Sequence, residues 1–480
     1  MELAMTDKTP APSAPKALDQ SPLHQAMHEQ MRDGSLFTRA IEHGQAYLRG
    51  ISDRPVAPDA AAQAALAGLD GPLPEGPGEA EAILDQLARL GGPATTAQVG
   101  GRFFGMVNGG LLPTALAARL LADTWDQNAV VHAVSPTNSR LEEICQRWLI
   151  ELLGLPEQTV AGFVSGTSMA IVCGLAAARW RLCQRLGCDI NAAGLAAAPR
   201  LRLITSRHTH STVLKAVALL GFGTDTIEYA EVDDQGRLRP ETLPALDETC
   251  ILILQAGNVN SGSFDPIRAC CEAARAAGAW VHIDGAFGLW AAACPNLAYL
   301  TDGLELAQSW SVDAHKTLNA PYDSGLSLCA DPEAMVAALQ NSAAYIPTSE
   351  HRDGMQFTPE MSRRTRAIDL WAALSFLGRS GVATLVEGLH ARARQFEAEL
   401  KQAGFSVIND VVFNQVLLEI GDEAKTTAFV DHVKASGEAW IGPSRWFDRP
   451  VVRVSLCSWA TTPADVTRAV AAFVAARELG

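Results

Sequence analysis

The sequence predicts an α/β fold, in which a mostly parallel central sheet carries helices on both faces. Short apolar runs alternate with stretches of helical periodicity between residues 162 and 330, which is the pattern of strands joined by crossover helices. Most of these runs are apolar almost throughout, as expected for strands that are buried on both faces. The chain has 480 residues and 48% of them are hydrophobic, so two or three domains with a large core are expected.

The elements of the predicted sheet follow one another in regular order. Two long helices come first, at residues 114–125 and 138–153. The expected strands are 201–206, 226–232, 250–257, 279–286, 306–314 and 325–330. The helices that we expect before and between these strands are 168–186, 211–220 and 265–277.

The N-terminal part has a different character. Residues 1–20 are polar and Pro-rich and lack the apolar core of a signal peptide, so they are predicted to be a disordered arm. Apolar residues recur at helical intervals in residues 21–50, which predicts one or two amphipathic helices. A further helix at 80–90 is expected to stop at Gly91-Gly92-Pro93. These helices have too little apolar surface for a core of their own, and we expect them to pack on another part of the protein or on another subunit.

The pattern changes again beyond Arg363. Helices are expected at 364–377, 382–403, 425–436 and 463–479, and strands at 405–408, 415–420 and 451–457. This order predicts a small α+β domain. The expected domains are thus the arm (1–20), an N-terminal helical segment (21–100), a large domain (101–362) and a small C-terminal domain (363–480).

The composition excludes several classes of protein. A formal net charge of −15 argues against nucleic-acid binding, which needs a basic face. Ten cysteines without C-x-x-C spacing indicate a reducing compartment rather than a zinc site or a disulfide framework. No apolar run is long enough to span a membrane. We therefore expect a soluble, cytoplasmic protein with no bound metal.

Polar residues at the ends of the predicted strands are the candidates for chemistry, because ligands gather at the carboxyl ends of strands in α/β sheets. Lys316 comes just after a buried strand, in Asp313-Ala314-His315-Lys316. Burial disfavours the ammonium form, so a lysine in such a place can attack a carbonyl. The structural alternative is a lysine whose stem packs while its ammonium reaches solvent.

A second candidate is Gly166-Thr167-Ser168, which leads directly into a helix. Free backbone N–H groups, the positive end of the helix dipole and hydroxyl donors together suit a phosphate. An ordinary N-cap is the structural alternative, since Ser and Thr are common caps.

Two further candidates are His210 and Asp284. His210 stands in His208-Thr209-His210-Ser211, where no third ligand supports a metal site, and its imidazole suits stacking on a flat aromatic ring. Asp284 ends a strongly apolar strand, so its carboxylate needs a cationic partner such as a protonated pyridine nitrogen, and the small Ala286 leaves room for a ring. Capping of the next helix or turn is the structural alternative for both residues.

The four candidates meet the requirements of one cofactor. Pyridoxal 5′-phosphate needs a phosphate cradle, a carboxylate for its ring nitrogen, a flat surface for its ring and an amine for its aldehyde. In the order of these requirements, the candidates are Gly166–Ser168, Asp284, His210 and Lys316. Their joint occurrence is far more specific than any one of them.

The sequence then resembles the group II pyridoxal-phosphate-dependent amino acid decarboxylases, which include the aromatic amino acid, glutamate and cysteine sulfinate decarboxylases. The similarity runs from about Ser21 to the C-terminus and implies the aspartate aminotransferase (type I) fold. The matching motifs are RFFG at 102–105, Ser135-Pro136 with Glu142 and Trp148, HSTV at 210–213 with Lys215-Ala216, Gly257-Asn258 with Gly262 and FDP at 264–266, residues 282–286, residues 313–316, and Ser362-Arg363-Arg364 with Trp371.

The resemblance implies a role for each candidate. Lys316 would form the Schiff base with the cofactor, and Asp284 would pair with the pyridinium. Ala286 and His210 would contact opposite faces of the ring. The residues implied in phosphate binding are Gly166, Thr167, Ser168 and His315. The large domain would hold the cofactor, and the N-terminal helices would wrap a partner in an obligate homodimer with active sites at the interface.

One feature departs from the family. Its members take a proton donor from a tyrosine on a mobile loop, but residues 346–362 contain none. Phe357 stands near the expected position, His351 lies within the loop and Tyr345 just precedes it. Loss of the tyrosine would divert the reaction towards oxygen and an aldehyde, unless His351 or a water donates the proton.

The resemblance implies decarboxylation of an L-amino acid to its amine and CO₂. The alternatives are transamination, decarboxylation-dependent oxidative deamination to an aldehyde, and a non-catalytic protein on the same fold. Phe103 and Phe104, with the small residues 108–110, fit an aromatic or medium-sized substrate side chain. An acidic substrate would need a cation such as Arg102 or Arg352. Arg453 is not interpreted as a carboxylate clamp, because the decarboxylase pattern also has an arginine in that strand.

Overall fold

The computed structural model describes residues 22–339 and 350–479. Contacts between Cα atoms divide the chain into two units. The first comprises Met1–Arg54 and Pro58–Thr96, and the second comprises Pro55–Ala57 and Ala97–Gly480. No helix in the described part of the chain is both long and apolar enough to cross a lipid bilayer.

The first unit consists of short helices held together by polar contacts. Arg39 joins two of them, because its guanidinium pairs with Glu81 at 3.0 Å and with Asp85 at 2.5 Å. None of these helices has a buried residue, and apolar side chains such as Phe37 stay exposed. The helices are α1 (Pro22–Asp33), α2 (Ser35–Arg49), α3 (Ala60–Ala65), α4 (Ala80–Gln86) and α5 (Gly92–Ala94).

The expected stop at Gly91-Gly92-Pro93 is wrong. Helical turns continue from α4 through Gly91 into α5, which ends at Ala94. Both glycines adopt helical dihedral angles. Pro93 then lies in the first turn of α5, where a missing N–H costs no hydrogen bond.

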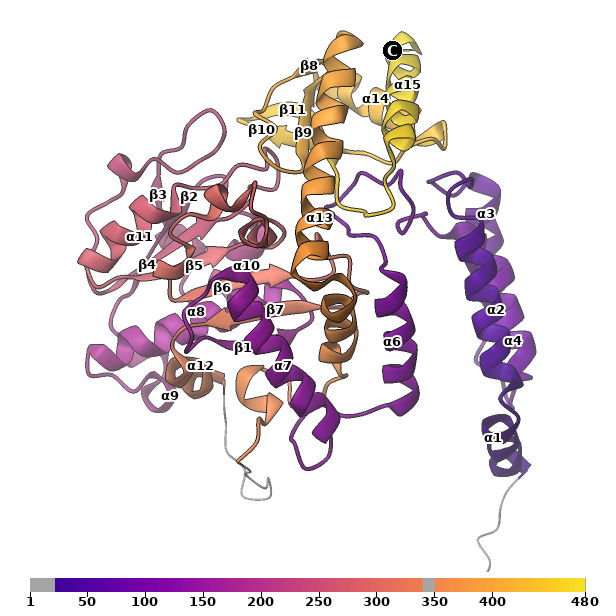
Figure 1. Ribbon diagram of the computed structural model, residues 1–480, viewed down its shortest axis with the longest axis horizontal. Helices are drawn as coiled ribbons and strands as arrows, with labels where there is room; N and C mark the ends of the chain where they lie inside the picture. The colour runs from indigo at the N-terminus through magenta and orange to yellow at the C-terminus, as the bar shows by residue number, and fades with distance from the viewer. Residues whose placement is uncertain (1–21, 340–349, 480) are drawn as a thin grey trace, which may run out of the picture. The chain divides into compact units, whose positions relative to one another are not determined.

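A seven-stranded sheet forms the centre of the second unit, in the order β1-β7-β6-β5-β4-β2-β3 (Figure 1). All neighbours from β6 to β3 are parallel, whereas β7 runs antiparallel to both β1 and β6. The predicted mostly parallel sheet is confirmed. The strands are β1 (Val160–Val164), β2 (Arg202–Ser206), β3 (Glu228–Ala230), β4 (Cys250–Gln255), β5 (Trp280–Asp284), β6 (Ser309–Asp313) and β7 (Gly325–Cys329).

Both faces of this sheet are buried, which explains the continuous apolar runs. Successive side chains of β4 alternate between two separate cores, because a strand has a period of two residues. Leu252 and Leu254 belong to the core beneath α7 (Pro136–Leu153), α11 (Ile267–Ala276) and α13 (Arg366–Gln402). Ile251 and Ile253 belong to the core beneath α8 (Thr167–Arg185), α10 (Ser211–Leu219) and α12 (Pro332–Leu339). Helices therefore cover both faces, as predicted (Figure 1).

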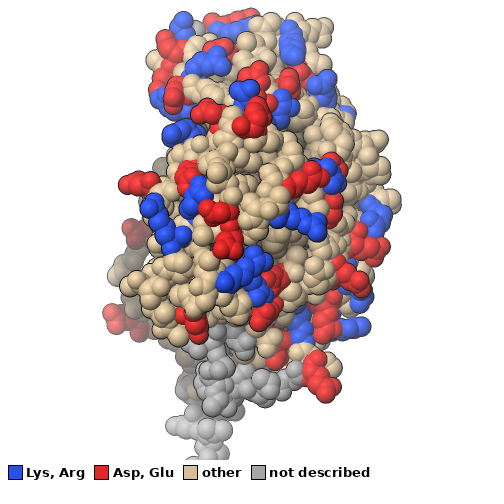
Figure 2. Space-filling model, turned by 90° about the vertical axis from the view of Figure 1, so that its left-hand side faces the viewer, with Lys and Arg blue, Asp and Glu red and all other residues tan. Residues whose placement is uncertain are grey.

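Most helices around the large sheet match the predicted stretches closely, but α9 (Ile190–Ala193) and α12 (Pro332–Leu339) were not predicted. The helices around the large sheet are α6 (Pro113–Trp125), α7 (Pro136–Leu153), α8 (Thr167–Arg185), α9 (Ile190–Ala193), α10 (Ser211–Leu219), α11 (Ile267–Ala276) and α12 (Pro332–Leu339). On the side of the molecule where α9 and α11 lie, acidic and basic side chains are interspersed among uncharged ones (Figure 2).

The C-terminal part forms a second, smaller sheet. Four antiparallel strands are arranged in the order β10-β11-β9-β8. Phenylalanines from helices and loops fill the core against them, with Phe396, Phe429 and Phe473 among the buried side chains. The elements are α13 (Arg366–Gln402), β8 (Ser406–Val407), β9 (Gln415–Glu419), α14 (Glu423–Ala435), β10 (Gly442–Trp446), β11 (Arg449–Ser455) and α15 (Pro463–Leu479).

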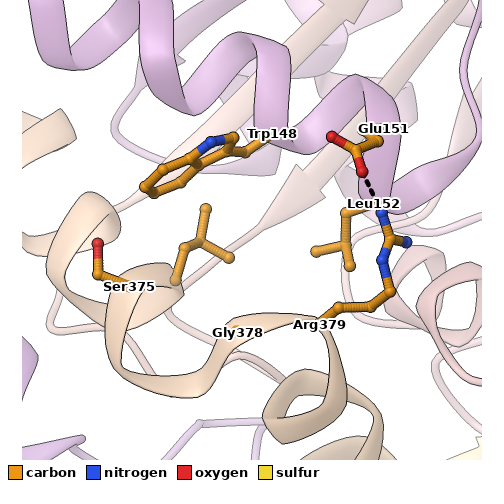
Figure 3. Close-up of a pocket in the computed structure, with 7 residues that line it drawn as sticks. Trp148, Glu151, Leu152, Ser375, Gly378 and Arg379 are labelled. Carbon is orange, nitrogen blue, oxygen red and sulfur yellow. Dashed lines mark hydrogen bonds and ion pairs between the residues drawn. The ribbon is translucent and has the colours of Figure 1, made fainter.

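The long helix α13 is broken once. Gly378 has φ 58° and ψ −178°, a conformation that glycine adopts without steric cost, and this break separates the two helices that the sequence predicts there. A pocket of about 350 Å³ lies between the break and α7, with Trp148 on one side (Figure 3). Arg379 bridges it by an ion pair with Glu151 at 2.7 Å.

Candidate active site

A pocket of about 490 Å³ lies where several strands of the large sheet end. It brings together every residue proposed from the sequence for cofactor binding, although these residues come from four separate segments of the chain. The eight residues are Gly166, Thr167, Ser168, His210, Asp284, Ala286, His315 and Lys316.

Lys316 lies in the turn that follows β6. Its ammonium nitrogen lies 2.8 Å from Oδ2 of Asp313, and its side chain is 20% exposed. Asp313 is only 2% exposed. Burial alone would raise the pKa of the Asp313 carboxyl, but the positive charge of Lys316 and the hydrogen bonds from Lys316 and Thr167 outweigh it and hold that pKa below its usual value. The carboxylate is therefore ionised and orients the amine.

Asp313 makes a second interaction that was not predicted from the sequence. Its other oxygen, Oδ1, accepts a hydrogen bond of 2.7 Å from the backbone N–H of Thr167, the first residue of α8. One carboxylate thus ties the lysine to the start of this helix. Its position three residues before Lys316 was the available signal, but spacing alone does not show which way a side chain points.

The start of α8 has the features of a phosphate cradle. The hydroxyl oxygen of Thr167 is buried and has no hydrogen-bond partner among the described residues. Gly166 allows a close approach, because a Cβ built there would lie 3.3 Å from the His315 ring. Backbone N–H groups, two hydroxyls and an imidazole meet at the positive end of a long helix, and this donor set fits a phosphate.

Asp284 lies at the end of β5 and lines the same pocket. Burial raises the pKa of its carboxyl to about 6, against the opposing charge of Lys316. Its Oδ1 accepts hydrogen bonds from the N–H of Ala286 at 3.2 Å and from the hydroxyl of Ser311 at 3.5 Å. A buried carboxylate with these neutral partners is stabilised by a cation placed beside it, which fits a protonated ring nitrogen.

A buried histidine stands behind Asp284. Nδ1 of His282 lies 2.8 Å from the hydroxyl of Ser309, and Nε2 lies 3.4 Å from the hydroxyl of Ser311. Burial lowers the pKa of His282 to about 3, so the ring is neutral. The chain His282–Ser311–Asp284 therefore supports the carboxylate without adding charge.

His210 both caps a helix and lines the pocket. Its Nδ1 accepts a hydrogen bond of 3.3 Å from the backbone N–H of Thr212 in the first turn of α10. Burial, together with the charges of Lys316 and Arg453, lowers the pKa of His210 to about 4. The ring is therefore neutral, and because Nδ1 is an acceptor, the proton is on Nε2.

Arg453 is a second cation of this pocket. It extends from β11, and its guanidinium donates a hydrogen bond of 3.2 Å to the carbonyl of Val259. Burial lowers the pKa of Arg453 to about 10, which still leaves it charged at neutral pH. The pocket therefore contains a positive charge besides that of Lys316.

The aromatic candidates for substrate binding lie elsewhere in the described structure. Phe103 stacks on Trp440 with ring centroids 4.8 Å apart, and Phe104 packs edge-on against Phe396 at 5.2 Å. Neither lines the pocket, whereas Met106 and Val107, a few residues further on, do. A place for Phe103 and Phe104 in a site shared with a partner subunit stays a prediction.

The loop candidates also lie outside the pocket. His351 stacks on His132 with centroids 4.0 Å apart, and Phe357 lies under the guanidinium of Arg352 at 4.0 Å. Tyr345 falls outside the described residues. The roles proposed for His351 and Phe357 in substrate binding stay predictions.

Arg352 and Arg102 are both engaged in ion pairs within the chain. Arg352 pairs with the fully buried Glu142 at 2.9 Å, and Arg363 pairs with the same carboxylate at 2.7 Å. Arg102 pairs with Glu438 at 3.2 Å. Each of these arginines would have to leave a carboxylate before it bound an acidic substrate.

The described residues contain no group of three or more His, Cys, Asp or Glu side chains placed to hold a metal ion. His208, the neighbour of His210, instead packs on Trp446 and Phe447 with ring centroids 4.9 and 4.4 Å away.

Residues 63–420 match a family model described as the pyridoxal-dependent decarboxylase conserved domain. The acidic amino acid decarboxylase GADL1 of Mus musculus is 28% identical over 330 residues, which are 66% of this chain and 59% of that protein. The 4-hydroxyphenylacetaldehyde synthase of Rhodiola rosea is 28% identical over 70% of this chain and 71% of that protein.

Solved structures show the same fold. A structure of Oryza sativa TDC with PLP and tryptamine aligns with a TM-score of 0.85 at 22% identity, covering 96% of this chain and 99% of that one. Mouse CSAD aligns with a TM-score of 0.85 at 21% identity, covering 93% and 98%.

Proposed function

The chain belongs to the pyridoxal-dependent decarboxylase family, and from that premise we propose that it removes the α-carboxyl group of an L-amino acid as CO₂ and releases the amine. It is a pyridoxal phosphate-dependent enzyme. The observation that carries the proposal is the single pocket that joins Lys316, Asp284, His210 and the start of α8.

Different residues of the pocket would bind different parts of the cofactor. Lys316 would bind its aldehyde, Asp284 its ring nitrogen, and the start of α8 with His315 its phosphate. Ala286 and His210 would contact its ring. When bound, pyridoxal phosphate supplies an aldehyde that bonds to amines and a ring that accepts the electron pair left when CO₂ departs.

The side chains of the pocket account for the remaining steps. Asp284, as an ionised carboxylate, would keep a proton on the ring nitrogen of the cofactor. The Nε2–H of His210 would donate a hydrogen bond to a carboxylate of the substrate, and the charge of Arg453 makes the pocket as a whole more positive. The tie between Lys316 and Asp313 returns the amine to the same place after each cycle.

The test begins with the wild-type protein and a panel of neutral, aromatic and acidic L-amino acids, with released CO₂ and amine measured for each. Borohydride reduction followed by peptide mapping should place the pyridoxyl group on Lys316. Lys316→Ala should lose the visible absorbance of the bound cofactor, and activity should fall more than roughly 1,000-fold. A label on another lysine would contradict the proposal.

Decarboxylation with oxidative deamination is the second candidate. Residues 350–362 contain Phe357 but no tyrosine, and one of the similar proteins is an aldehyde synthase. In this reaction molecular oxygen is consumed, and aldehyde, ammonia and hydrogen peroxide form instead of the amine. Peroxide and aldehyde assays on the same panel separate the two candidates, and a keto acid product would instead indicate transamination.

We also propose a homodimer in which the helices of the first unit cover a partner. The dimer is supported by the exposed apolar side chains on α1 and α2, including Met31 and Phe37. No described residue of the unit buries these side chains. Cytoplasmic location is proposed on the ten cysteines, all of which are free. Light scattering of the full chain, and of a variant with Met31→Glu and Phe37→Glu, tests the dimer.

A further inference from the structure

One tyrosine belongs to the pocket of Lys316. The described residues include Tyr47, Tyr229, Tyr299 and Tyr322, and of these only Tyr322 lines this pocket. It lies on the segment between Lys316 and β7, and its side chain is half exposed. A phenol at this place is both close to the reacting groups and open to water.

Polar contacts hold the phenol in one position. The hydroxyl of Tyr322 donates a hydrogen bond of 3.0 Å to Oδ1 of Asn108, and the amide of Asn108 donates one of 3.1 Å to Gln98. The ring of Tyr322 lies over that of His315, with centroids 4.3 Å apart and planes inclined by 30°. The phenol therefore has a fixed direction.

Arginines anchor the backbone at the same point. The carbonyl of Tyr322 accepts a hydrogen bond of 3.3 Å from Arg119. The next residue, Asp323, pairs with Arg364 at 2.7 Å and with Arg366 at 3.0 Å. Arg119, Arg364 and Arg366 thus fix the backbone of the segment that carries Tyr322.

The partner of the phenol lies next to Lys316. The N–H of Gly109 donates a hydrogen bond of 3.3 Å to the carbonyl of His315. A Cβ on Gly109 would lie only 2.1 Å from the carbonyl oxygen of Lys316, so only glycine permits this approach. Asn108 directly precedes Gly109, so it is fixed beside the backbone of Lys316. The hydrogen bond from Tyr322 to Asn108 therefore holds the phenol near the same place.

We propose that Tyr322 is the catalytic residue that protonates the substrate α-carbon after CO₂ has left, a step that rests on the proposed function. The electron pair of the broken C–C bond forms a new C–H bond with the proton of the Tyr322 hydroxyl. The O–H bond breaks, and the resulting phenolate takes a proton from water. No oxidant or second reactant is needed.

The protonation state of the phenol suits this step. Partial burial, with the nearby Cys457 and Asp313, raises the pKa of the Tyr322 hydroxyl above its usual value. The hydroxyl is therefore fully protonated at neutral pH, and its proton moves only when a strong base forms beside it.

The test compares Tyr322→Phe with the wild-type holoenzyme on the best substrate of the panel. We expect amine formation to fall by roughly 100- to 1,000-fold, while the visible absorbance of the bound cofactor stays unchanged. In D₂O, the wild-type enzyme should place one deuterium stereospecifically at Cα, and the residual amine of the variant should show both configurations. CO₂ that is still released should appear with aldehyde and peroxide.

Matched variants separate this role from others. Tyr299→Phe, on a residue 68% exposed and outside the pocket, should behave as wild type. Asn108→Ala should lower amine formation without changing the Kd of the cofactor. The proposal is overturned if Tyr322→Phe forms amine at the wild-type rate and configuration, if only Tyr345→Phe diverts the product, or if the wild-type enzyme itself yields aldehyde. Absence of CO₂ release by the wild-type enzyme would instead refute the proposed function, and this step with it.

Discussion

The ammonium nitrogen of Lys316 lies 2.8 Å from the carboxylate of Asp313, and the same carboxylate caps α8 through Thr167. The residues that would bind the aldehyde and the phosphate of pyridoxal phosphate are thus positioned by one buried side chain. Its charge fixes the amine, and its second oxygen fixes the helix that is proposed to bind the phosphate.

Asp313→Asn should weaken cofactor binding. The amide still accepts the hydrogen bond from Thr167, but as a neutral group it holds the start of α8 less strongly, because a charge-assisted contact is worth more than a neutral one. We expect the Kd for pyridoxal phosphate to rise about tenfold, equivalent to about 1.4 kcal/mol. Titration of the apoenzyme followed by tryptophan fluorescence measures it. Asp302→Asn, which removes an exposed carboxylate paired with Arg268, is the control and should leave the Kd unchanged.

Asp284 should make cofactor binding depend on pH. Its pKa is about 6 in the cofactor-free protein, and pairing with a cation lowers it. Below pH 6 the carboxyl must lose a proton when the cofactor binds, so affinity should fall as the pH decreases from 6 and stay constant above it. The Kd measured from pH 5 to 8 shows this dependence.

Asp284→Asn isolates that effect. The cofactor phosphate also titrates in this range, so the variant shows the dependence that remains without the carboxyl. We expect a flatter profile and an activity lower by roughly 100-fold or more, because the developing charge is no longer stabilised. Parallel profiles for the two proteins would exclude Asp284 as the partner of the ring nitrogen.

Thr167→Val should weaken cofactor binding without harming the fold. The substitution keeps the shape and removes a buried hydroxyl that has no protein partner. Loss of one hydrogen bond to a charged group costs about 1.5–3 kcal/mol, so the Kd should rise roughly tenfold to 100-fold. Thr159→Val is a matched control, because Thr159 also has a buried hydroxyl without a partner but lies outside the pocket. An equal effect of the two substitutions would argue against a phosphate at α8.

Glu142→Gln should destabilise the fold. Burial alone would raise the pKa of Glu142, but Arg363 and Arg352 outweigh it and hold that pKa below its usual value. The carboxylate therefore stabilises the protein at neutral pH, and this contribution is lost as the pH falls through the acid range. Removing the charge leaves two buried guanidinium groups uncompensated, at a cost of about 3–5 kcal/mol.

Urea denaturation at pH 7 measures that cost. Glu151→Gln, which removes one partner of the exposed pair with Arg379, should cost less than about 1 kcal/mol. The difference between the two variants should shrink towards pH 4. A small effect of Glu142→Gln at pH 7 would mean that the two arginines find other partners.

The sequence predicted the strands correctly where the local hydrophobic pattern agrees with the burial of the strand. The continuous apolar runs predicted the central strands, since strands such as β4 bury both faces. The strands β1 and β10 were not predicted, because Gly162 interrupts the first and the pair Gly442-Pro443 begins the second. Glycine and proline predict the end of a strand when the neighbouring strand that pairs with them is unknown.

The same limit applies to the pocket. Lys316, Asp284 and His210 were identified because their position at strand ends is a local property. Asp313, Tyr322 and Arg453 were not assigned to the site, because their roles depend on which distant residues they meet. Phe103 and Phe104 were assigned to substrate binding, yet the described chain packs them on Trp440 and Phe396.

The segment that carries these two phenylalanines has a mechanical consequence. At one end Phe104 exchanges backbone hydrogen bonds with Trp440 and with Ser455 of the small sheet, and at the other end Gly109 bonds to His315. A turn formed by the four residues 105–108 separates the two attachments. Met106 and Val107 of this turn line the pocket, so a displacement of the small sheet would also displace part of the wall beside Lys316.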